Sequence, residues 1–245
     1  MDKLIFLLVL SAILSGCVTP SIKPVKTKKG EQAVSNRQVL EAAREINSYN
    51  VRKPPKRYFD ENKQLYKKTV KRILPAAITI CKEIKGSSET CSWDIGLANS
   101  RAFNAYATGD KEIKIFLGVV ENIYYEDELA FVIAHEIGHH LASHITESMI
   151  TTAIGAVLGA SVGSPDLGAG IGRAAFSKSQ EIEADYISML VLKEAGYDID
   201  RARECLIRMT RIGGGGVYSV FLGTHPSGPE RLLRFDSNFA EMEKD

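Results

Sequence analysis

Four of the five histidines in this chain fall within residues 135–144, and two of them are spaced for metal binding. His135 and His139 are four residues apart, so in a helix both side chains project from one face, about one turn apart. Two imidazoles placed in this way can ligate one zinc ion. Glu136 directly follows the first of them, where it can act as a general base without ligating the metal. The pattern His-Glu-x-x-His therefore predicts two zinc ligands and a general base on one helical turn.

The residues around these histidines predict the helix that must carry them. Apolar residues recur at helical spacing, which indicates a buried amphipathic helix; they are Leu129, Val132, Ile133, Ile137 and Leu141. The alternative is an ordinary helix whose histidines are polar-face residues. His140 and His144 repeat the four-residue spacing, but no acid follows His140 and a helical wheel points this pair away from the first. We therefore expect His140 and His144 to lie on the flank or the surface.

A catalytic zinc usually has three protein ligands and keeps its fourth position for water. The best candidate for the third ligand is Glu181, in a segment with a second helical pattern. Asp185 is four residues further on and shares its face, so it can hydrogen-bond to a ligand histidine and orient it. The alternative is an acidic helix start, where Glu181 and Glu183 favour the helix dipole.

Four ordered motifs carry a resemblance to a known family. They are Phe103-Asn104-Ala-Tyr-Ala with the following Gly109, His-Glu-x-x-His, Glu-x-x-x-Asp, and His225-Pro with Glu230-Arg231. Together they resemble the zinc metallopeptidases related to HtpX and the CAAX prenyl endopeptidases, over about residues 60–240. Behind a lipoprotein-like leader, the arrangement is most similar to the LoiP and BepA group of bacterial envelope lipoprotein peptidases. The resemblance implies an α+β, mainly α-helical zincin fold of the gluzincin type, with a small β-sheet beside the zinc-binding helix.

The resemblance also implies roles for three further residues. Asn104 and the strand around it line the substrate cleft, unless Asn104 only supports a turn. His225 either assists catalysis at the oxyanion or coordinates the zinc and holds the enzyme latent, and a plain turn histidine before Pro226 is the alternative. Arg231, in the last helix, pairs with an acid near the site.

Periodicity and breakers outline the elements that position these residues. A chain of 245 residues that is 44% hydrophobic can bury one sizeable core. We expect helices from 35 or 36 to 45 and from 60 to 85, the second bent at Pro75. We expect strands at 93–98, 101–107 and 112–116, with a turn at 108–110 between the last two. In zincins such a sheet lies beside the zinc helix, and its edge strand binds extended substrate.

The N-terminus predicts where the chain acts. A short apolar run follows Lys3 and ends in Leu14-Ser-Gly-Cys17, which resembles a bacterial lipobox. We expect a signal peptide at 1–16, a lipid-anchored flexible tether at 17–34 beginning at the lipidated Cys17, and the peptidase domain at 35–245. An ordinary leader with an incidental cysteine is the alternative. Val18 after the cysteine favours sorting to the outer membrane, facing the bacterial periplasm.

Three cysteines remain after lipidation of Cys17. The envelope is oxidising, so Cys81 and Cys91, ten residues apart, are predicted to form a disulfide. Cys205 then remains as a buried free thiol.

Residues 149–173 are rich in Gly and Ala, and we expect a lid over the site in preference to a bilayer span.

These observations predict a zinc metalloendopeptidase with one zinc per chain, which acts in protein quality control. Its expected substrates are unfolded or misassembled envelope proteins, its membrane contact is the lipid anchor, and outer-membrane assembly machinery is a further candidate partner. The net charge of +1 does not favour nucleic acid as a partner. The rival hypothesis is a non-enzymatic, zinc-containing chaperone or assembly factor for outer-membrane proteins. A third is an integral membrane protease that inserts residues 149–165.

Overall fold

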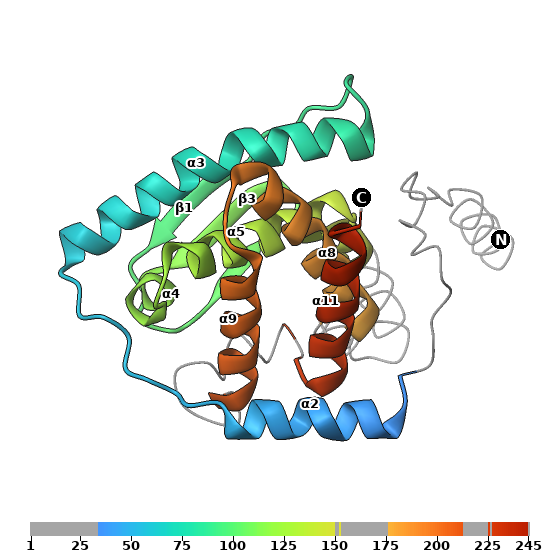
Figure 1. Cartoon of the computed structure of the whole chain (residues 1–245). Helices are drawn as coiled ribbons and strands as arrows, with labels where there is room; N and C mark the ends of the chain where they lie inside the picture. The colour runs from blue at the N-terminus through green and yellow to red at the C-terminus, as the bar shows by residue number, and fades with distance from the viewer. Residues whose placement is uncertain (1–33, 150–151, 153–175, 213–224, 226, 245) are drawn as a thin grey trace, which may run out of the picture.

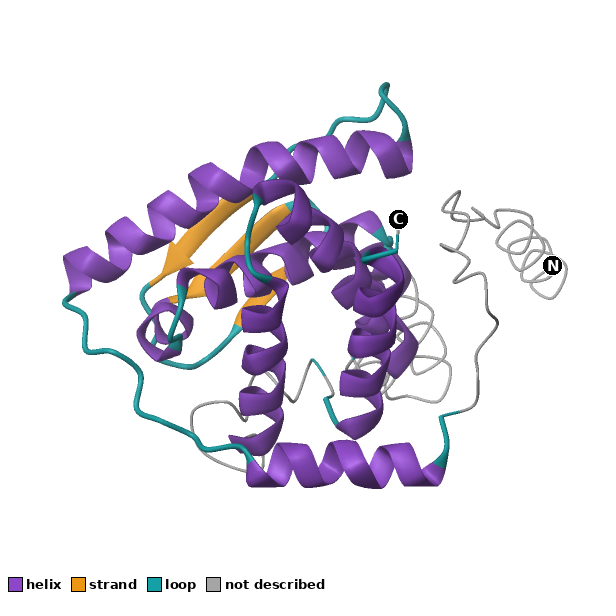
Figure 2. Cartoon of the chain, viewed as in Figure 1, coloured by secondary structure: helices purple, strands orange, loops and turns teal. Residues whose placement is uncertain are grey.

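Helices pack against a small sheet in the computed structural model, which describes residues 34–149, 152, 176–212, 225 and 227–244. Figure 2 shows the sheet at one side of the helical assembly. The predicted class, mainly helical α+β with a small sheet beside the zinc helix, is confirmed. The predicted leader at 1–16, Cys17 and the lid at 149–173 lie outside the described residues, apart from residues 149 and 152.

The sheet has three described strands in the order β1-β3-β2. β1 (Asp94–Ala98) pairs with β3 (Glu112–Phe116) in parallel, and β2 (Ala105–Ala107) pairs with β3 as an antiparallel hairpin. The predicted strand at 101–107 is therefore too long. Its first residues turn away because the amide of Gly118 donates to the carbonyl of Ser100 at 2.9 Å, which holds this segment against the chain that follows β3.

The central element is α5 (Glu126–Leu141), whose residues are buried on almost every side. Its first turn carries Glu126, Asp127 and Glu128, and acidic side chains stabilise a helix N-terminus. α3 (Phe59–Lys85) lies along the sheet and ends at Gly86, which has a φ of 96°. Pro75 lies inside this helix without ending it.

α8 (Lys178–Ala195) packs directly against α5. Ser177 caps its start and exchanges hydrogen bonds with Gln180, as in a capping box. At the contact, a Cβ on Gly138 would lie 2.7 Å from the carbonyl oxygen of Ala184. Only glycine fits there, and this close approach brings the acids of α8 next to the histidines of α5.

Three further helices close the molecule on the other side of α5. α9 (Ile199–Ile212) and α11 (Pro229–Met242) stand side by side, and α2 (Asn36–Ser48) crosses their ends (Figure 1). Ser35 caps α2 as predicted, although the helix runs to Ser48 and not to 45. A short helix that we did not predict, α4 (Leu117–Asn122), follows β3 at once.

A disulfide joins Cys81, in the last turns of α3, to Cys91 before β1. Closing a loop of this length removes entropy from the unfolded chain worth about 3 kcal/mol. Replacing both cysteines by serine is expected to lower the free energy of unfolding in urea by about that amount. Cys205 is a buried free thiol outside this bond, so a Cys205→Ala variant should lose as much stability on addition of reducing agent as we expect the parent to lose. An equal stability of the parent with and without reductant would contradict a structural role for the bond.

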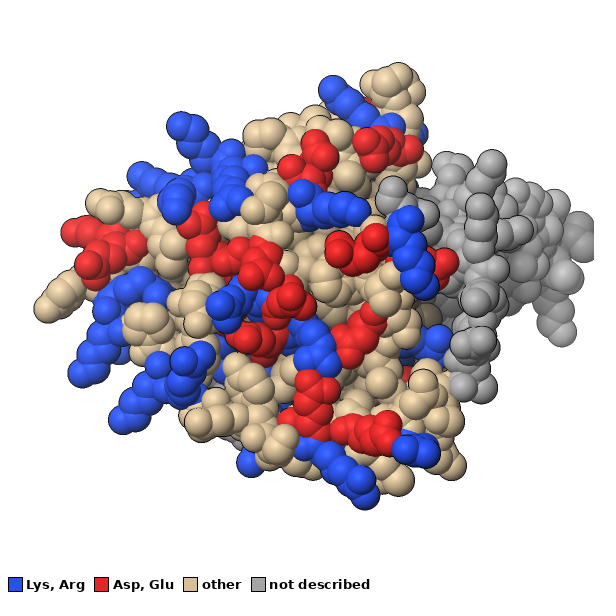
Figure 3. All heavy atoms as spheres, in the orientation of Figure 1, with Lys and Arg blue, Asp and Glu red and all other residues tan. Residues whose placement is uncertain are grey.

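Surface charge bears on nucleic-acid binding, and the length and apolar character of the helices bear on membrane spanning. Side chains of both signs are interspersed over the face drawn in Figure 3. Among the described helices, none combines the length and the apolar character needed to cross a bilayer.

Candidate metal centre

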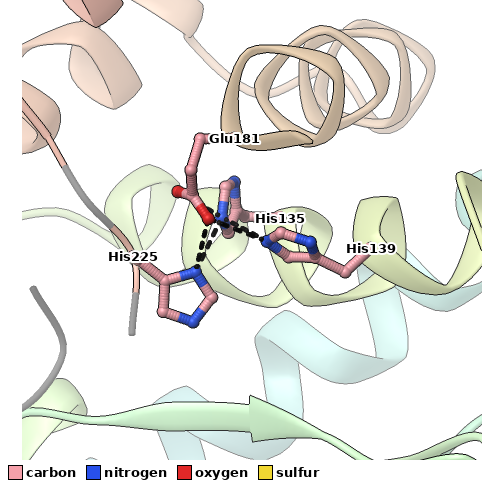
Figure 4. A group of neighbouring side chains, drawn as sticks. All are labelled: His135, His139, Glu181 and His225. Carbon is pink, nitrogen blue, oxygen red and sulfur yellow. Dashed lines mark hydrogen bonds and ion pairs between the residues drawn. The ribbon is translucent and has the colours of Figure 1, made fainter. Parts of the chain in front are cut away.

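Four buried side chains converge at the contact between α5 and α8 (Figure 4). α5 contributes His135 and His139, α8 contributes Glu181, and His225 comes from the segment before α11. One ligand atom from each lies within 4.8 Å of the others, and each side chain is at most 2% exposed. Of the sequence-predicted site residues, the structure thus brings together the three expected ligands and His225.

The arrangement of ring nitrogens fits a cation. His135 Nδ1 lies 3.0 Å from Asp185 Oδ1, and the negative charge of this carboxylate favours a proton on Nδ1. Its Nε2 lone pair then faces His139 Nε2 at 3.1 Å and Glu181 Oε2 at 3.4 Å. A lone pair so close to another nitrogen and to a carboxylate is repelled unless a proton or a metal ion lies between them. Two imidazoles and a carboxylate are ligands that zinc prefers.

Arg231 holds the two acids of α8 in place. Its guanidinium donates to both oxygens of Asp185, at 2.7 and 2.8 Å, and also to Glu181. Burial alone would raise the pKa of Glu181 and of Asp185, but Arg231 and His135 together outweigh it and the pKa of each carboxyl falls below its usual value. Both acids are therefore ionised, one to bind a metal and one to orient His135.

The same acids set the proton affinity of His135. Burial alone would lower its pKa, but Glu181 and Asp185 raise it to about 9 in the metal-free protein. Metal binding must displace this proton, so the affinity for zinc is expected to fall as the pH is lowered.

Glu136 lies beside the ligands without joining them. Its side chain is 1% exposed, and Oε1 accepts no hydrogen bond among the described residues although His225 Nε2 lies 3.4 Å away. Burial raises the pKa of Glu136, and the nearby His225 and His135 oppose this only partly. A carboxylate with a raised pKa beside a metal site is suited to take and return a proton near neutral pH.

The prediction for His144 was wrong. His144 is 2% exposed and its Nδ1 lies 3.0 Å from His139 Nδ1. The helical wheel failed because α5 ends at Leu141 and Ser143 takes a positive φ of 64°, which turns the next residue back toward His139. His140 is partly buried and burial lowers its pKa to about 4; it lies outside the ligand group.

Asn104 precedes β2, the edge strand that packs near α5. Its carbonyl accepts from the amide of Phe116 at 3.0 Å, so the residue supports the hairpin. Its side-chain oxygen is buried and has no hydrogen-bond partner among the described residues. A role of Asn104 in substrate binding stays a prediction.

Comparison with known proteins decides the family. The sequence profile described as Peptidase family M48 matches residues 65–238, which include every residue of the metal centre. The chain belongs to peptidase family M48. M48 metallopeptidases use zinc, so the predicted cofactor and enzyme class are confirmed. The closer resemblance to envelope lipoprotein peptidases stays a prediction.

Two curated relatives are both called mitochondrial metalloendopeptidase OMA1. The Arabidopsis thaliana protein is 35% identical over 150 residues, which cover 58% of this chain and 31% of the relative. The Schizosaccharomyces pombe protein is 27% identical over 184 residues, which cover 71% of this chain and 53% of the relative. The chain thus spans between about a third and about half of the length of these relatives.

These relatives correct one prediction. The leader predicted a lipoprotein of the bacterial outer membrane that faces the periplasm, but both relatives are mitochondrial enzymes by name. The predicted location is therefore contradicted. The lipid anchor at Cys17 and the outer-membrane assembly partner have no support among these relatives, and Cys17 lies outside the described residues.

Proposed function

We propose that this M48 chain is a zinc endopeptidase that hydrolyses extended segments of unfolded proteins, and that His225 holds its resting state closed. The convergence of His135, His139 and Glu181 beside a buried Glu136 carries the proposal. A zinc ion held by these ligands would polarise the scissile carbonyl and lower the pKa of the attacking water toward 7. The relatives named as metalloendopeptidases support the same activity.

The chain's own residues supply the remaining chemistry. Glu136 takes a proton from the attacking water and returns it to the leaving amine, because its raised pKa allows both transfers. Asp185 and Arg231 hold His135 and Glu181 in place throughout. β2 is an edge strand of the described sheet, so an extended segment can pair with it through main-chain hydrogen bonds. Recognition of this kind depends on backbone more than on sequence, which favours unfolded substrates.

His225 lies against both Glu181 and Glu136. Its Nδ1 lies 3.1 Å from Glu181 Oε1 and its Nε2 lies 3.4 Å from Glu136 Oε1. With His225 as a fourth protein ligand, the ligand set has the closed form of a structural zinc site and leaves no position for water. Catalysis then requires His225 to leave, and Gly213 to Gly216 lie in the segment that precedes it.

The closed ligand set is also the observation that favours a second function. A chaperone could use zinc only to stabilise its fold and bind clients without cutting them. Such a site gives no role to Glu136, a buried carboxylate whose Oε1 accepts no hydrogen bond among the described residues. Burying a carboxylate oxygen that accepts no hydrogen bond costs free energy. A role for Glu136 in catalysis accounts for this cost, so the observation favours the peptidase.

Replacing His225 with alanine tests the proposal. We expect His225→Ala to keep its zinc and to digest unfolded casein about tenfold faster than the parent, as when a state populated one-tenth of the time becomes the only state. His140→Ala, which changes a histidine outside the ligand group, is the control and should digest casein at the parent's rate. If His225→Ala binds zinc but neither it nor the parent cleaves casein, the chaperone is the better account. If only His225→Ala is inactive, His225 assists catalysis and does not hold the enzyme closed.

A further inference from the structure

The second nitrogen of His139 faces another buried histidine. His139 Nδ1 lies 3.0 Å from His144 Nδ1, and His144 Nε2 lies 3.2 Å from Glu183 Oε2. The His144 side chain is 2% exposed and that of Glu183 is 39% exposed. A line of three polar groups therefore runs from the metal centre to the surface.

Metal binding fixes the proton positions along this line. His139 faces the other ligands with Nε2, at 3.1 Å from His135 Nε2 and 3.3 Å from Glu181 Oε1. To ligate a metal through Nε2, a neutral His139 must carry its proton on Nδ1. His144 Nδ1 must then accept that proton, so His144 carries its own proton on Nε2, where Glu183 accepts it.

We propose that His144 and Glu183 are positioning residues that hold His139 in the orientation and tautomer needed to bind zinc. The other ligand histidine has the same kind of support, because His135 Nδ1 lies 3.0 Å from Asp185 Oδ1. Hydrogen-bond partners of this kind orient metal-binding histidines and raise their basicity. For His139, the hydrogen-bond partner is the imidazole of His144, which is itself oriented by the carboxylate of Glu183.

Among the described residues, the polar atom that lies against His139 Nδ1 is Nδ1 of His144. Phe176 stacks on the face of the His139 ring, with centroids 3.9 Å apart and planes at 22°. Stacking restrains the plane of the ring but is the same after the ring flips, so the hydrogen bond at Nδ1 favours the orientation in which Nε2 faces the other ligands. Ser143, with its φ of 64°, provides the turn that brings His144 to the ring edge.

Variants at His144 separate hydrogen bonding from packing. His144→Leu keeps a side chain of similar size but removes the acceptor, and we expect its zinc affinity to fall about 10–100-fold in competition with a chromophoric chelator. His144→Asn places an amide oxygen near the position of Nδ1 and should recover most of this affinity. Glu183→Ala should weaken zinc binding less than His144→Leu, because Glu183 is partly exposed.

His140→Leu is the matched control. His140 is the neighbouring histidine, is partly buried and lies outside the ligand group, so this variant should bind zinc as the parent does. The proposal is overturned if His144→Leu binds zinc as tightly as the parent, or if His144→Asn loses as much affinity as His144→Leu.

A measurement on the parent chain tests the proposal without relying on a substituted variant that has to fold. Nitrogen NMR of the zinc-loaded chain with labelled histidines should show a proton on Nδ1 of His139 and none on Nδ1 of His144. A proton on Nδ1 of His144 would overturn the proposal. The inference rests on the zinc site of the proposed peptidase, but the two can fail separately. A parent that binds zinc without cleaving casein contradicts the peptidase alone, and unchanged zinc affinity in an active His144→Leu contradicts the positioning role alone.

Discussion

Replacing Glu136 with glutamine is expected to abolish proteolysis and to leave the metal centre intact. The amide has the size of the carboxylate but cannot take a proton, so the rate of casein cleavage should fall by about 10²–10⁴-fold, the contribution of a general base. Zinc content should stay at one per chain, because Glu136 contributes no atom to the ligand group. Both quantities can be measured on the same sample.

The substitution is best made in a His225→Ala background as well as in the parent, so that a closed resting state does not hide the effect. Loss of cleavage without loss of zinc in both backgrounds assigns the base to Glu136. Retention of activity by Glu136→Gln would rule out the proposed mechanism. Loss of zinc together with activity would make Glu136 a residue that supports the ligands.

Replacing Arg231 is expected to have the largest effect on the free energy of unfolding. Its side chain is 4% exposed and pairs with Glu181 and Asp185, which are also buried. Arg231→Met keeps the length of the side chain but leaves two buried carboxylates without their cation, and removing one partner of a buried ion pair costs about 3–5 kcal/mol. The loss should appear in urea unfolding of the metal-free chain near neutral pH.

The ion pairs of Arg231 with Glu181 and Asp185 also predict how the free energy of unfolding depends on pH. Arg231 keeps the folded pKa values of Glu181 and Asp185 below their unfolded values, so the stability they contribute is present at neutral pH and is lost as the pH falls through the folded pKa values. Arg231→Met should therefore flatten the loss of stability in acid. Arg234→Met, a change of the same type on the same helix, is the control and should change the free energy of unfolding by no more than about 0.5 kcal/mol. Equal effects of the two variants would contradict the buried network.

The residues on two regular helices could be predicted from sequence because helix geometry alone places them. Four-residue spacing put His135 and His139 on one face of α5, and the same spacing put Glu181 and Asp185 on one face of α8. Gly138, which no spacing argument singled out, lets the two helices approach closely enough for the four residues to meet. The small sheet and its hairpin were also predictable from alternating residues around a turn.

What the sequence did not show lies where regular structure ends. His144 follows a turn with a positive φ at Ser143, so a helical wheel pointed it to the surface. β2 is shorter than predicted because a tertiary hydrogen bond from Gly118 holds Ser100 elsewhere. The partners of Arg231 depend on the packing of α11 against α8, which spacing within either helix does not contain. The location was inferred from the leader and from the resemblance to envelope lipoprotein peptidases, and the curated relatives contradict it.

The rate of casein cleavage as a function of bound zinc tests the central claim most directly. The His225→Ala chain would be stripped with a chelator, reloaded with measured amounts of zinc and assayed at each step. The account predicts no cleavage without zinc and a rate that rises in proportion to occupancy up to one zinc per chain. Cleavage that is unchanged by removal of the metal would contradict a zinc peptidase built on His135, His139 and Glu181.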